Sequence, residues 1–299
     1  MKKAYLQLHL AVLLWGFTAI LGKLITLDAT LLVLYRMFLS TIALWIFLRL
    51  KNRVHTPDRK TILKASGIGI LVALHWITFY AAIKESNVSV AVSCFSSLAL
   101  FTTIVDAVIN KKKLQLAEVL LSIAVIGGIF IIFSFQQLYA KGMVLSLISA
   151  FLAALFSVSN KRLYFQHDPG TITVYELGAG FLFLSLLYAI YMPPGFQSFY
   201  WPSLHDWFYL TILSVLCTSL AFTIGNYALQ KLDAFTCNLT VNLEPVYSII
   251  LAIIIFNENE VLNTGFYIGT LIILTSVIVH TIYQFRKSKK IIEINALQN

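Results

Sequence analysis

Long apolar runs recur along the whole of this 299-residue sequence, and they restrict its fold more than any other feature. Each run has about 20 residues, the length that an α-helix needs to cross the hydrocarbon core of a bilayer. Only 12% of the residues are charged and the mean hydropathy is +0.83, so there is too little polar surface to cover a soluble core. Strands of a membrane barrel alternate in polarity, and these runs do not. We therefore expect an all-α integral membrane protein with almost no part outside the bilayer.

Ten membrane spans fit the sequence, with short connections between them. They cover about 4–25, 31–50, 64–83, 88–109, 115–135, 142–162, 173–192, 207–229, 234–256 and 262–284. Basic residues decide the orientation, because they collect in cytoplasmic loops. With a cytoplasmic N-terminus, all but four of the 22 basic residues fall on the cytoplasmic side: Lys84 and Lys141 lie in outer loops, and Lys23 and Arg36 within spans. We expect a multi-pass protein of the cell (inner) membrane with both termini cytoplasmic.

The two halves of the chain are related in sequence. Sliding the chain by 147 residues places 80–101 on 227–248 without a gap. Tyr80 then meets Tyr227, and Ser97 meets Glu244. Because each half has five spans, an odd number, the second copy enters the membrane from the opposite side. The sequence thus predicts ten transmembrane helices arranged as two five-helix repeats of inverted topology.

This repeat sets the domain boundaries that we expect: 1–137 for the first repeat, 138–285 for the second and 286–299 for a basic cytoplasmic tail. Inverted repeats are typical of secondary transporters, whose site lies near the middle of the membrane between the repeats. The alternative is that duplication only built a stable helix bundle.

Four segments carry a resemblance to a known family: "LLWGFTAILGK" at 13–23, the pair Tyr35-Arg36, the stretch 79–101 and, above all, the stretch 227–258. On these residues the sequence resembles the EamA-type family of the drug/metabolite transporter superfamily, over nearly all of 4–285. The resemblance implies a ten-helix carrier for amino acids, other metabolites or drugs. This chain has Ser97-Leu98 where a proline is common in the family, which removes the family's basis for expecting a kink there.

An acid and a proline stand together in the ninth apolar run, at Glu244 and Pro245. Glu244 lies about ten residues, roughly 15 Å, from either end of the run, where an ionised carboxylate costs about 2.5–3.5 kcal/mol. Pro245 cannot donate a hydrogen bond to the carbonyl of Val241 and pushes Glu244 away from helical angles. We expect a kinked helix in which Glu244 accepts a proton or a substrate amine. The alternative is a structural acid satisfied by a neighbouring helix.

Polar and aromatic side chains on other spans are further candidates for a substrate pocket. His75 and Phe79 offer a titratable ring and an aromatic face, although a lone histidine is often a hydrogen-bonded packing residue. Ser97 is the repeat mate of Glu244, in a stripe of serines that also suits close helix packing. The complete set of substrate-binding candidates is Trp15, Thr18, His75, Phe79, Tyr80, Ser97, Asn226, Tyr227, Asn242 and Glu244.

Arg36 and Glu176 look like an ion pair, but inverted topology places them near opposite ends of their spans. We expect each to snorkel or pair locally, with Asp28 a candidate partner for Arg36. Arg36 joins Glu244 as a candidate for coupling or gating. Close helix packing is the expected role of four glycines: Gly127, Gly128, Gly178 and Gly180.

Signatures of catalysis and of cofactor binding are missing from the sequence: it has no GxSxG, no Walker loop and no HExxH. The cysteines Cys94, Cys217 and Cys237 are odd in number and lack any CxxC, so they favour neither a disulfide framework nor zinc. We expect no enzymatic activity, no cofactor and no metal. The net charge of +9 is dispersed among short loops, which disfavours nucleic acid as a partner.

The favoured interpretation is a secondary transporter of a small polar or amphipathic metabolite that works by alternating access, with proton coupling or exchange as options. Its partners would be the small-molecule substrate and the lipid bilayer. A non-transporting membrane scaffold or regulator is the alternative, and an intramembrane enzyme is disfavoured. Substrate, direction, coupling ion and oligomeric state stay open.

Overall fold

The computed structural model describes the whole chain apart from Met1, Val54, Lys112, Leu114, Gln115 and residues 191–200, 230–239, 242 and 298–299. Every regular element among the described residues is a helix. The α-helices are α1 (Lys2–Leu24), α2 (Ala29–Leu50), α3 (Arg59–Glu85), α4 (Val88–Phe95), α5 (Leu98–Ile109), α6 (Leu116–Phe135), α7 (Ala140–Gln166), α8 (Pro169–Ile190), α9 (Leu204–Thr211), α10 (Ala221–Leu229), α12 (Glu244–Phe256) and α13 (Thr264–Leu297). A π-helix, η2 (Ile212–Leu220), joins α9 to α10, and the short 3-10 helices η1 (Gln137–Tyr139) and η3 (Glu258–Glu260) precede α7 and α13.

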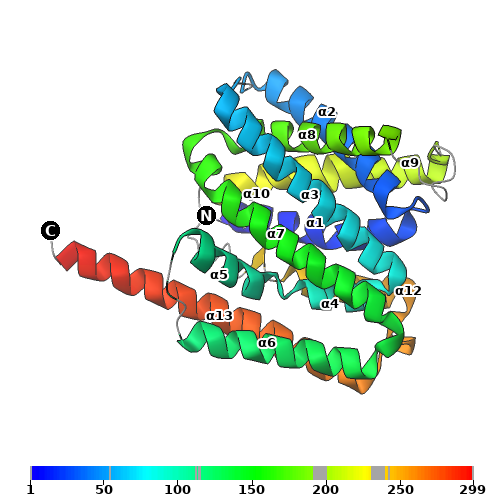
Figure 1. Ribbon diagram of the computed structural model, residues 1–299, viewed down its shortest axis with the longest axis vertical. Helices are drawn as coiled ribbons and strands as arrows, with labels where there is room; N and C mark the ends of the chain where they lie inside the picture. Colours follow the sequence, from blue (N-terminus) through cyan, green and yellow to red (C-terminus); the bar gives the residue numbers. More distant parts are fainter. Residues whose placement is uncertain are drawn as a thin grey trace.

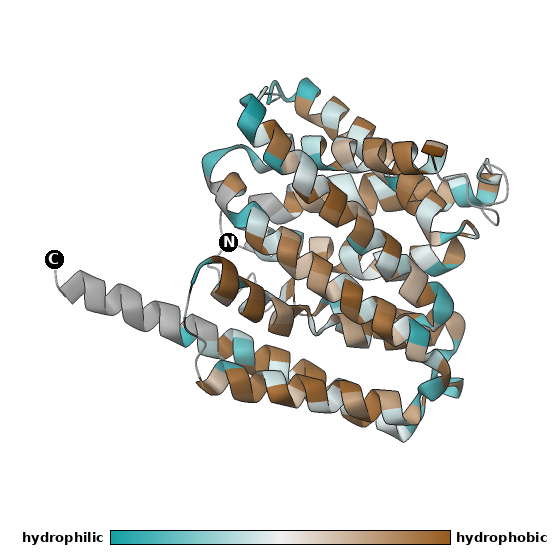
Figure 2. Cartoon of the chain, in the orientation of Figure 1, coloured by the Kyte–Doolittle hydropathy of each residue, from teal (hydrophilic) through white to brown (hydrophobic). Residues whose placement is uncertain are grey.

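Nine helical stretches in the described part of the chain are long and apolar enough to cross a membrane, and α12 is a shorter apolar helix. The expectation of a multi-pass, all-α membrane protein is therefore confirmed. Part of the ninth expected span, 234–256, lies outside the described residues. Figure 2 shows hydrophobic residues along the helix bodies and hydrophilic residues at the turns.

The helices form one bundle, in which α1 begins and α13 ends on the same side (Figure 1). We call this side the termini end. The opposite side, the far end, holds the C-terminal ends of α1, α3 and α12.

Polar caps begin several of these helices. Asp28 accepts hydrogen bonds from the backbone N–H groups of Thr30 and Leu31 at the start of α2, and Asp58 does the same for Lys60 and Thr61 at the start of α3. Such caps satisfy N–H groups that a helix leaves without partners in its first turn. Because Asp28 is used in this way, the expected pairing of Asp28 with Arg36 is wrong.

Helices from the two halves of the chain pack against each other throughout the bundle. α3 packs on α7 and α8, α1 packs on α10 and α12, and α6 packs along α13, as Figure 1 also shows. The main apolar core, which includes Ile25, Leu32 and Ile172, lies within this network.

Two of the expected packing glycines sit at very close helix crossings. A Cβ atom on Gly128 would lie 2.8 Å from the carbonyl oxygen of Gly269, where α6 meets α13. A Cβ atom on Gly180 would lie 2.8 Å from the carbonyl oxygen of Gly69, where α8 meets α3. By contrast, Gly127 has open space beside it and Gly178 makes only ordinary contact with Thr41, so the close-packing role was wrong for these two.

The fourth span is broken even though it lacks the proline. α4 ends at Phe95 and α5 begins at Leu98, and Ser96 and Ser97 form a turn between them. In this turn the N–H of Ser96 is shared between the carbonyls of Val92 at 3.1 Å and Ser93 at 3.3 Å. The N–H of Ser97 bonds to the carbonyl of Cys94 at 3.1 Å, which is the tighter i to i−3 pattern. The missing proline therefore does not keep this helix straight.

The same turn recurs at the matching place in the second half. There the N–H of Leu243 bonds to the carbonyl of Thr240 at 3.0 Å, and α12 starts at Glu244. Pro245 is in the first turn of α12, where its missing N–H leaves no bond unmade. The acid and the proline are thus the first two residues of α12.

Candidate functional site

The most unusual buried group of the bundle is the guanidinium of Arg36 on α2, whose residue is only 5% exposed. Its Nη1 donates to the hydroxyl of Tyr80 at 2.5 Å, while Nε and Nη2 donate to the hydroxyl of Thr218 at 3.2 and 3.0 Å. Its central carbon lies 3.7 Å from the ring centre of Trp76, a cation–π contact. Neutral groups from α3 and η2 therefore hold this cation inside a membrane-spanning bundle.

The π-helix explains how Thr218 reaches Arg36. In η2 the hydroxyl of Thr218 bonds back to the carbonyl of Leu213 at 2.8 Å, five residues earlier. π-Helices are rare and are frequently found at functional sites. Thr218 lies within this π-helix and accepts hydrogen bonds from Arg36 of α2.

Glu244 is the acidic residue whose charge acts on the Arg36 guanidinium. Its carboxyl interacts electrostatically with both Arg36 and Tyr80. The described residues hold salt bridges elsewhere, but none that joins Arg36 to a carboxylate. Because Glu244 begins α12, the positive end of that helix also stabilises its negative charge.

His75 stands beside this group, in an aromatic cluster. Its ring packs against Phe79, Phe95 and Phe156, with centroids 5.4 to 6.2 Å apart. Its Nδ1 lies 2.8 Å from the hydroxyl of Ser149. Tyr80, Phe79 and His75 are thus brought together on α3, close to the Arg36 side chain.

Trp15 and Thr18 lie on α1, which packs against α12. Trp15 is grouped with Val241, Leu243 and Tyr247, and the Thr18 hydroxyl bonds to the carbonyl of Trp15 at 2.6 Å. The hydroxyl of Ser248 on α12 donates to the carbonyl of Gly16 at 3.0 Å. These contacts hold the beginning of α12, and with it Glu244, against α1.

The remaining candidates differ in how far the structure describes them. Ser97 is fully buried at the α4–α5 turn, and its hydroxyl has no hydrogen-bond partner among the described residues. Asn226 and Tyr227 lie on α10, but their side chains are outside the described part, as is the whole of Asn242. The structure gives no contact for these three residues.

Glu176 is remote from Arg36 in its contacts. Its carboxylate accepts from the hydroxyl of Tyr164 at 3.3 Å, and Tyr164 also contacts Thr173. A local arrangement is what the sequence predicts for Glu176. The local partners of Arg36, in contrast, are hydroxyl groups and an aromatic ring.

A polar network closes the far end of the bundle. Lys23 at the end of α1 lies 2.8 Å from Glu258, whose carboxylate also accepts from the backbone N–H groups of Val88 and Ser89 at 2.9 and 2.8 Å. The N–H and hydroxyl of Thr26 donate to Asp206, at the start of α9, at 2.7 and 2.8 Å. These contacts tie the first half of the chain to the second.

Sequence reasoning missed three of the side chains that matter here as partners of other residues: Thr218, Lys23 and Glu258. Glu258 ends the stretch 227–258, but nothing in the sequence pairs it with a residue so far away. Only the charge of Lys23 inside an apolar run could have suggested that it needs an acid.

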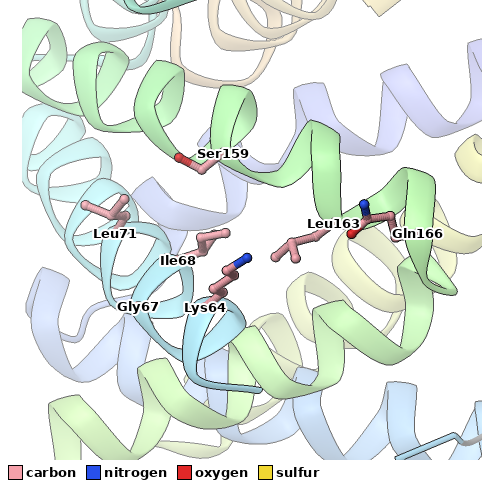
Figure 3. A pocket seen from close by; sticks show the side chains of 7 residues that line it. All are labelled: Lys64, Gly67, Ile68, Leu71, Ser159, Leu163 and Gln166. Atoms are coloured by element: carbon pink, nitrogen blue, oxygen red, sulfur yellow. The ribbon is translucent and has the colours of Figure 1, made fainter. Parts of the chain in front are cut away.

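A separate cavity of about 520 Å³ lies at the termini end, between the start of α3 and the end of α7. Its walls are mostly apolar, and Lys64 and Gln166 bring polar groups to it, as Figure 3 shows. Seven residues line it: Lys64, Gly67, Ile68, Leu71, Ser159, Leu163 and Gln166. None of them belongs to the Arg36 group.

Metal ligation finds no support in the described residues, where no three His, Cys, Asp or Glu side chains gather. Cys94 and Cys217 are buried free thiols, and Cys237 lies outside the described part.

A multi-pass bundle with buried ionisable groups of both signs is the architecture of a membrane transporter. The sequence profile of the EamA-like transporter family matches this chain twice, over residues 2–134 and 140–282. The chain therefore belongs to the EamA-like transporter family, of the drug/metabolite transporter superfamily, as its sequence motifs suggest.

Two known proteins are similar to this chain over nearly its whole length. An uncharacterized transporter from Archaeoglobus fulgidus is 27% identical over 298 residues, which cover 95% of this chain and 99% of that protein. A chain described only as a crystal structure of a protein superposes with a TM-score of 0.62 at 17% identity, covering 94% of this chain and 98% of its own. This second likeness concerns the fold alone.

Proposed function

We propose that the protein is a secondary carrier that moves a small polar or amphipathic metabolite across the cell membrane by alternating access. The observation that carries the proposal is a buried cation, Arg36, held by neutral groups inside a bundle of membrane-spanning helices that also contains the acid Glu244. Placing an ionisable side chain at membrane depth costs free energy. Residues of this kind therefore commonly serve a function, such as binding a substrate or relaying protons.

Two repeats of inverted topology are the proposed basis of alternating access. Supporting this, helix contacts recur when the halves are exchanged: α3 packs on α7 as α10 packs on α1, and α3 packs on α8 as η2 packs on α2. The pairs α2–α8 and α6–α13 exchange with themselves. With such symmetry, the two repeats can exchange conformations, so that a central site opens first to one side of the membrane and then to the other.

We further propose that the termini end is cytoplasmic. At this end Arg53 lies in the α2–α3 connection, Arg59 and Lys60 begin α3, and Lys161 lies near the end of α7. Lys84, near the end of α3, and Lys141, near the start of α7, lie at the far end. This bias follows the rule that cytoplasmic loops are basic. The far-end contacts Lys23–Glu258 and Thr26–Asp206 then close the outer side, and the site would open towards the cytoplasm.

Glu244 is proposed to accept a proton or a substrate amine. A carboxyl group at the first residue of α12 sits where α1 and α12 meet, between the two repeats. Binding a cation there offsets the loss of hydration of the carboxylate.

Transport into liposomes tests the proposal. Purified protein would be reconstituted and screened with radiolabelled amino acids, sugars and cationic drugs, under a pH gradient and in exchange mode. We expect at least one compound to move, and Glu244→Gln to change the pH dependence of its uptake. Glu85→Gln is the matched control, because Glu85 lies at the exposed far end in a pair with Lys141.

Two results would contradict the proposal. A carrier in which Glu244→Gln leaves the rate and its pH dependence unchanged has no coupling role for this acid. If no compound moves in either mode, the scaffold interpretation gains, and a partner should then be sought on the lipid-facing helices.

A further inference from the structure

We propose that Arg36 is the binding site for a carboxylate group of the transported molecule. This inference rests on the carrier function proposed above, and it names the chemical class of the substrate. It starts from the charge of Arg36, which stays protonated in proteins under all ordinary conditions.

A buried charge needs a partner of opposite sign, because taking it out of water is strongly unfavourable. Salt bridges in the described residues satisfy Lys23, Arg53 and Lys141, but none satisfies Arg36. The partners of Arg36 are the hydroxyls of Tyr80 and Thr218 and the ring of Trp76, which carry no formal charge. Within the part of the chain that the structure describes, no carboxylate is therefore bonded to this cation.

The donor count points to the same conclusion. A guanidinium has five N–H groups, one on Nε and two on each Nη. The three hydrogen bonds of Arg36 use one N–H on each nitrogen. One N–H on each Nη is left over for a ligand. A carboxylate can accept from both nitrogens of such a pair in a bidentate fork.

The surroundings hold the guanidinium ready for such a ligand. Stacking on Trp76 and the double contact with Thr218 fix the plane of the group before a ligand arrives. Trp76, Thr218 and Glu244 are each only partly buried, whereas Arg36 itself is buried. A pre-ordered donor loses less side-chain entropy on binding.

Glu244 limits which anions are suitable. No salt bridge among the described residues joins Glu244 to Arg36. When Glu244 is ionised, it repels a second carboxylate bound nearby unless a positive group lies between the two. A substrate whose carboxylate binds Arg36 while a cationic or protonated group faces Glu244 satisfies both residues. Simple dicarboxylates should bind worst.

The experiment measures binding to the purified full-length protein in detergent. The probes are a panel of L-amino acids and short monocarboxylic acids, each compared with its own carboxamide, in which a neutral group replaces the carboxylate. Binding is followed by thermal stabilisation and by the fluorescence of Trp76, with Trp76→Phe identifying the signal of that ring.

We expect at least one acid to bind about tenfold or more tightly than its amide, as the loss of a charge-assisted pair predicts. Arg36→Gln should abolish this preference, and Arg36→Lys should keep part of it. If Arg36→Gln does not fold, Thr218→Val serves as a second variant. This substitution removes the acceptor of the Arg36 Nε and Nη2 groups but keeps the charge of Arg36. The affinity for acids should change, and the affinity for amides should stay the same.

The inference is overturned if no acid in the panel binds, if acids and amides bind equally, or if the preference survives in Arg36→Gln. A purely structural Arg36 would lower the melting temperature of the variant without changing the ratio of acid to amide affinity. Liposome transport separates the two proposals. Acid-selective binding without transport contradicts only the carrier function, whereas amide transport as fast as acid transport contradicts only the carboxylate site.

Discussion

Lys23 and Glu258 form an ion pair of 2.8 Å that connects the end of α1 to the turn after α12, 235 residues along the chain. Glu258 is 2% exposed, and its two oxygens also accept the first N–H groups of α4. One carboxylate thus fastens helices from both halves at the far end. It completes the N-terminus of α4 much as a capping residue would, but from a distant part of the sequence.

Glu258→Ala should lower the stability of the protein markedly. It leaves the Lys23 ammonium and two buried N–H groups without their acceptor, and removing one partner of a buried pair costs on the order of 3 kcal/mol. Thermal unfolding in detergent, followed by intrinsic fluorescence, should show a melting temperature several degrees lower. The control is Lys141→Ala, which breaks the exposed Lys141–Glu85 pair and should change the melting temperature little. Equal effects of the two variants would contradict the role given to Glu258.

Gly128→Ala should destabilise the packing of α6 on α13. The new Cβ atom would meet the carbonyl oxygen of Gly269 at 2.8 Å, so the helices must move apart. Overpacking of this kind costs about 1–3 kcal/mol. Its neighbour Gly127 has nothing within 4 Å, and Gly127→Ala should be neutral or slightly stabilising, since alanine favours helix. The change in melting temperature should therefore differ in sign or size between the two variants. Equal changes would contradict the close crossing of α6 and α13 at Gly128.

Ser97→Ala should leave stability unchanged or raise it. The hydroxyl of Ser97 is buried without a hydrogen-bond partner among the described residues, so removing it relieves an unsatisfied group. Ser93, one turn earlier, accepts from Thr270 at 3.1 Å, and Ser93→Ala should lower the melting temperature. If Ser97 contacts substrate, its alanine variant should also show slower uptake in liposomes despite normal stability. A large loss of stability in Ser97→Ala would show that the hydroxyl is bonded.

Asp58→Ala should weaken the start of α3 in a pH-dependent way. The hydrogen bond from the Thr61 hydroxyl, at 2.5 Å, holds the pKa of Asp58 below its ordinary value, with help from backbone N–H groups. A depressed pKa in the folded state means that the stabilisation is present above the ordinary carboxyl pKa and disappears as the pH falls through the folded value. The difference in melting temperature between wild type and Asp58→Ala should be clear at pH 7 and shrink below about pH 4.

The matched variant for this test is Asp58→Asn, because asparagine also caps helices well but does not titrate in this range. It should retain much of the wild-type stability at pH 7. Its difference from Asp58→Ala should stay constant as the pH falls. A wild-type difference from alanine that is independent of pH would contradict the role of the charge.

Much of this fold was open to prediction because a bilayer restricts the choices of a chain. In the hydrocarbon core, a long apolar run must form a helix so that its backbone N–H and C=O groups are hydrogen-bonded. The positions of the spans could therefore be inferred from the sequence, and the motifs in them indicated the family. The charge of Glu244 and the proline beside it also marked a break in the ninth span. The break at Ser97 was not predicted, since no proline or glycine announces it.

The sequence by itself determined the all-helical membrane class, the two related halves and the residues on which attention falls. The tertiary structure alone decided the partners: Arg36 with Tyr80, Thr218 and Trp76, Lys23 with Glu258, and Asp28 with its own helix. These pairings depend on how helices distant in sequence cross and rotate, which is set by packing contacts such as Gly128 on Gly269. Local periodicity indicates which face of a helix is apolar. It does not indicate which side chain of a distant helix contacts that face, as Thr218 contacts Arg36 from 182 residues away.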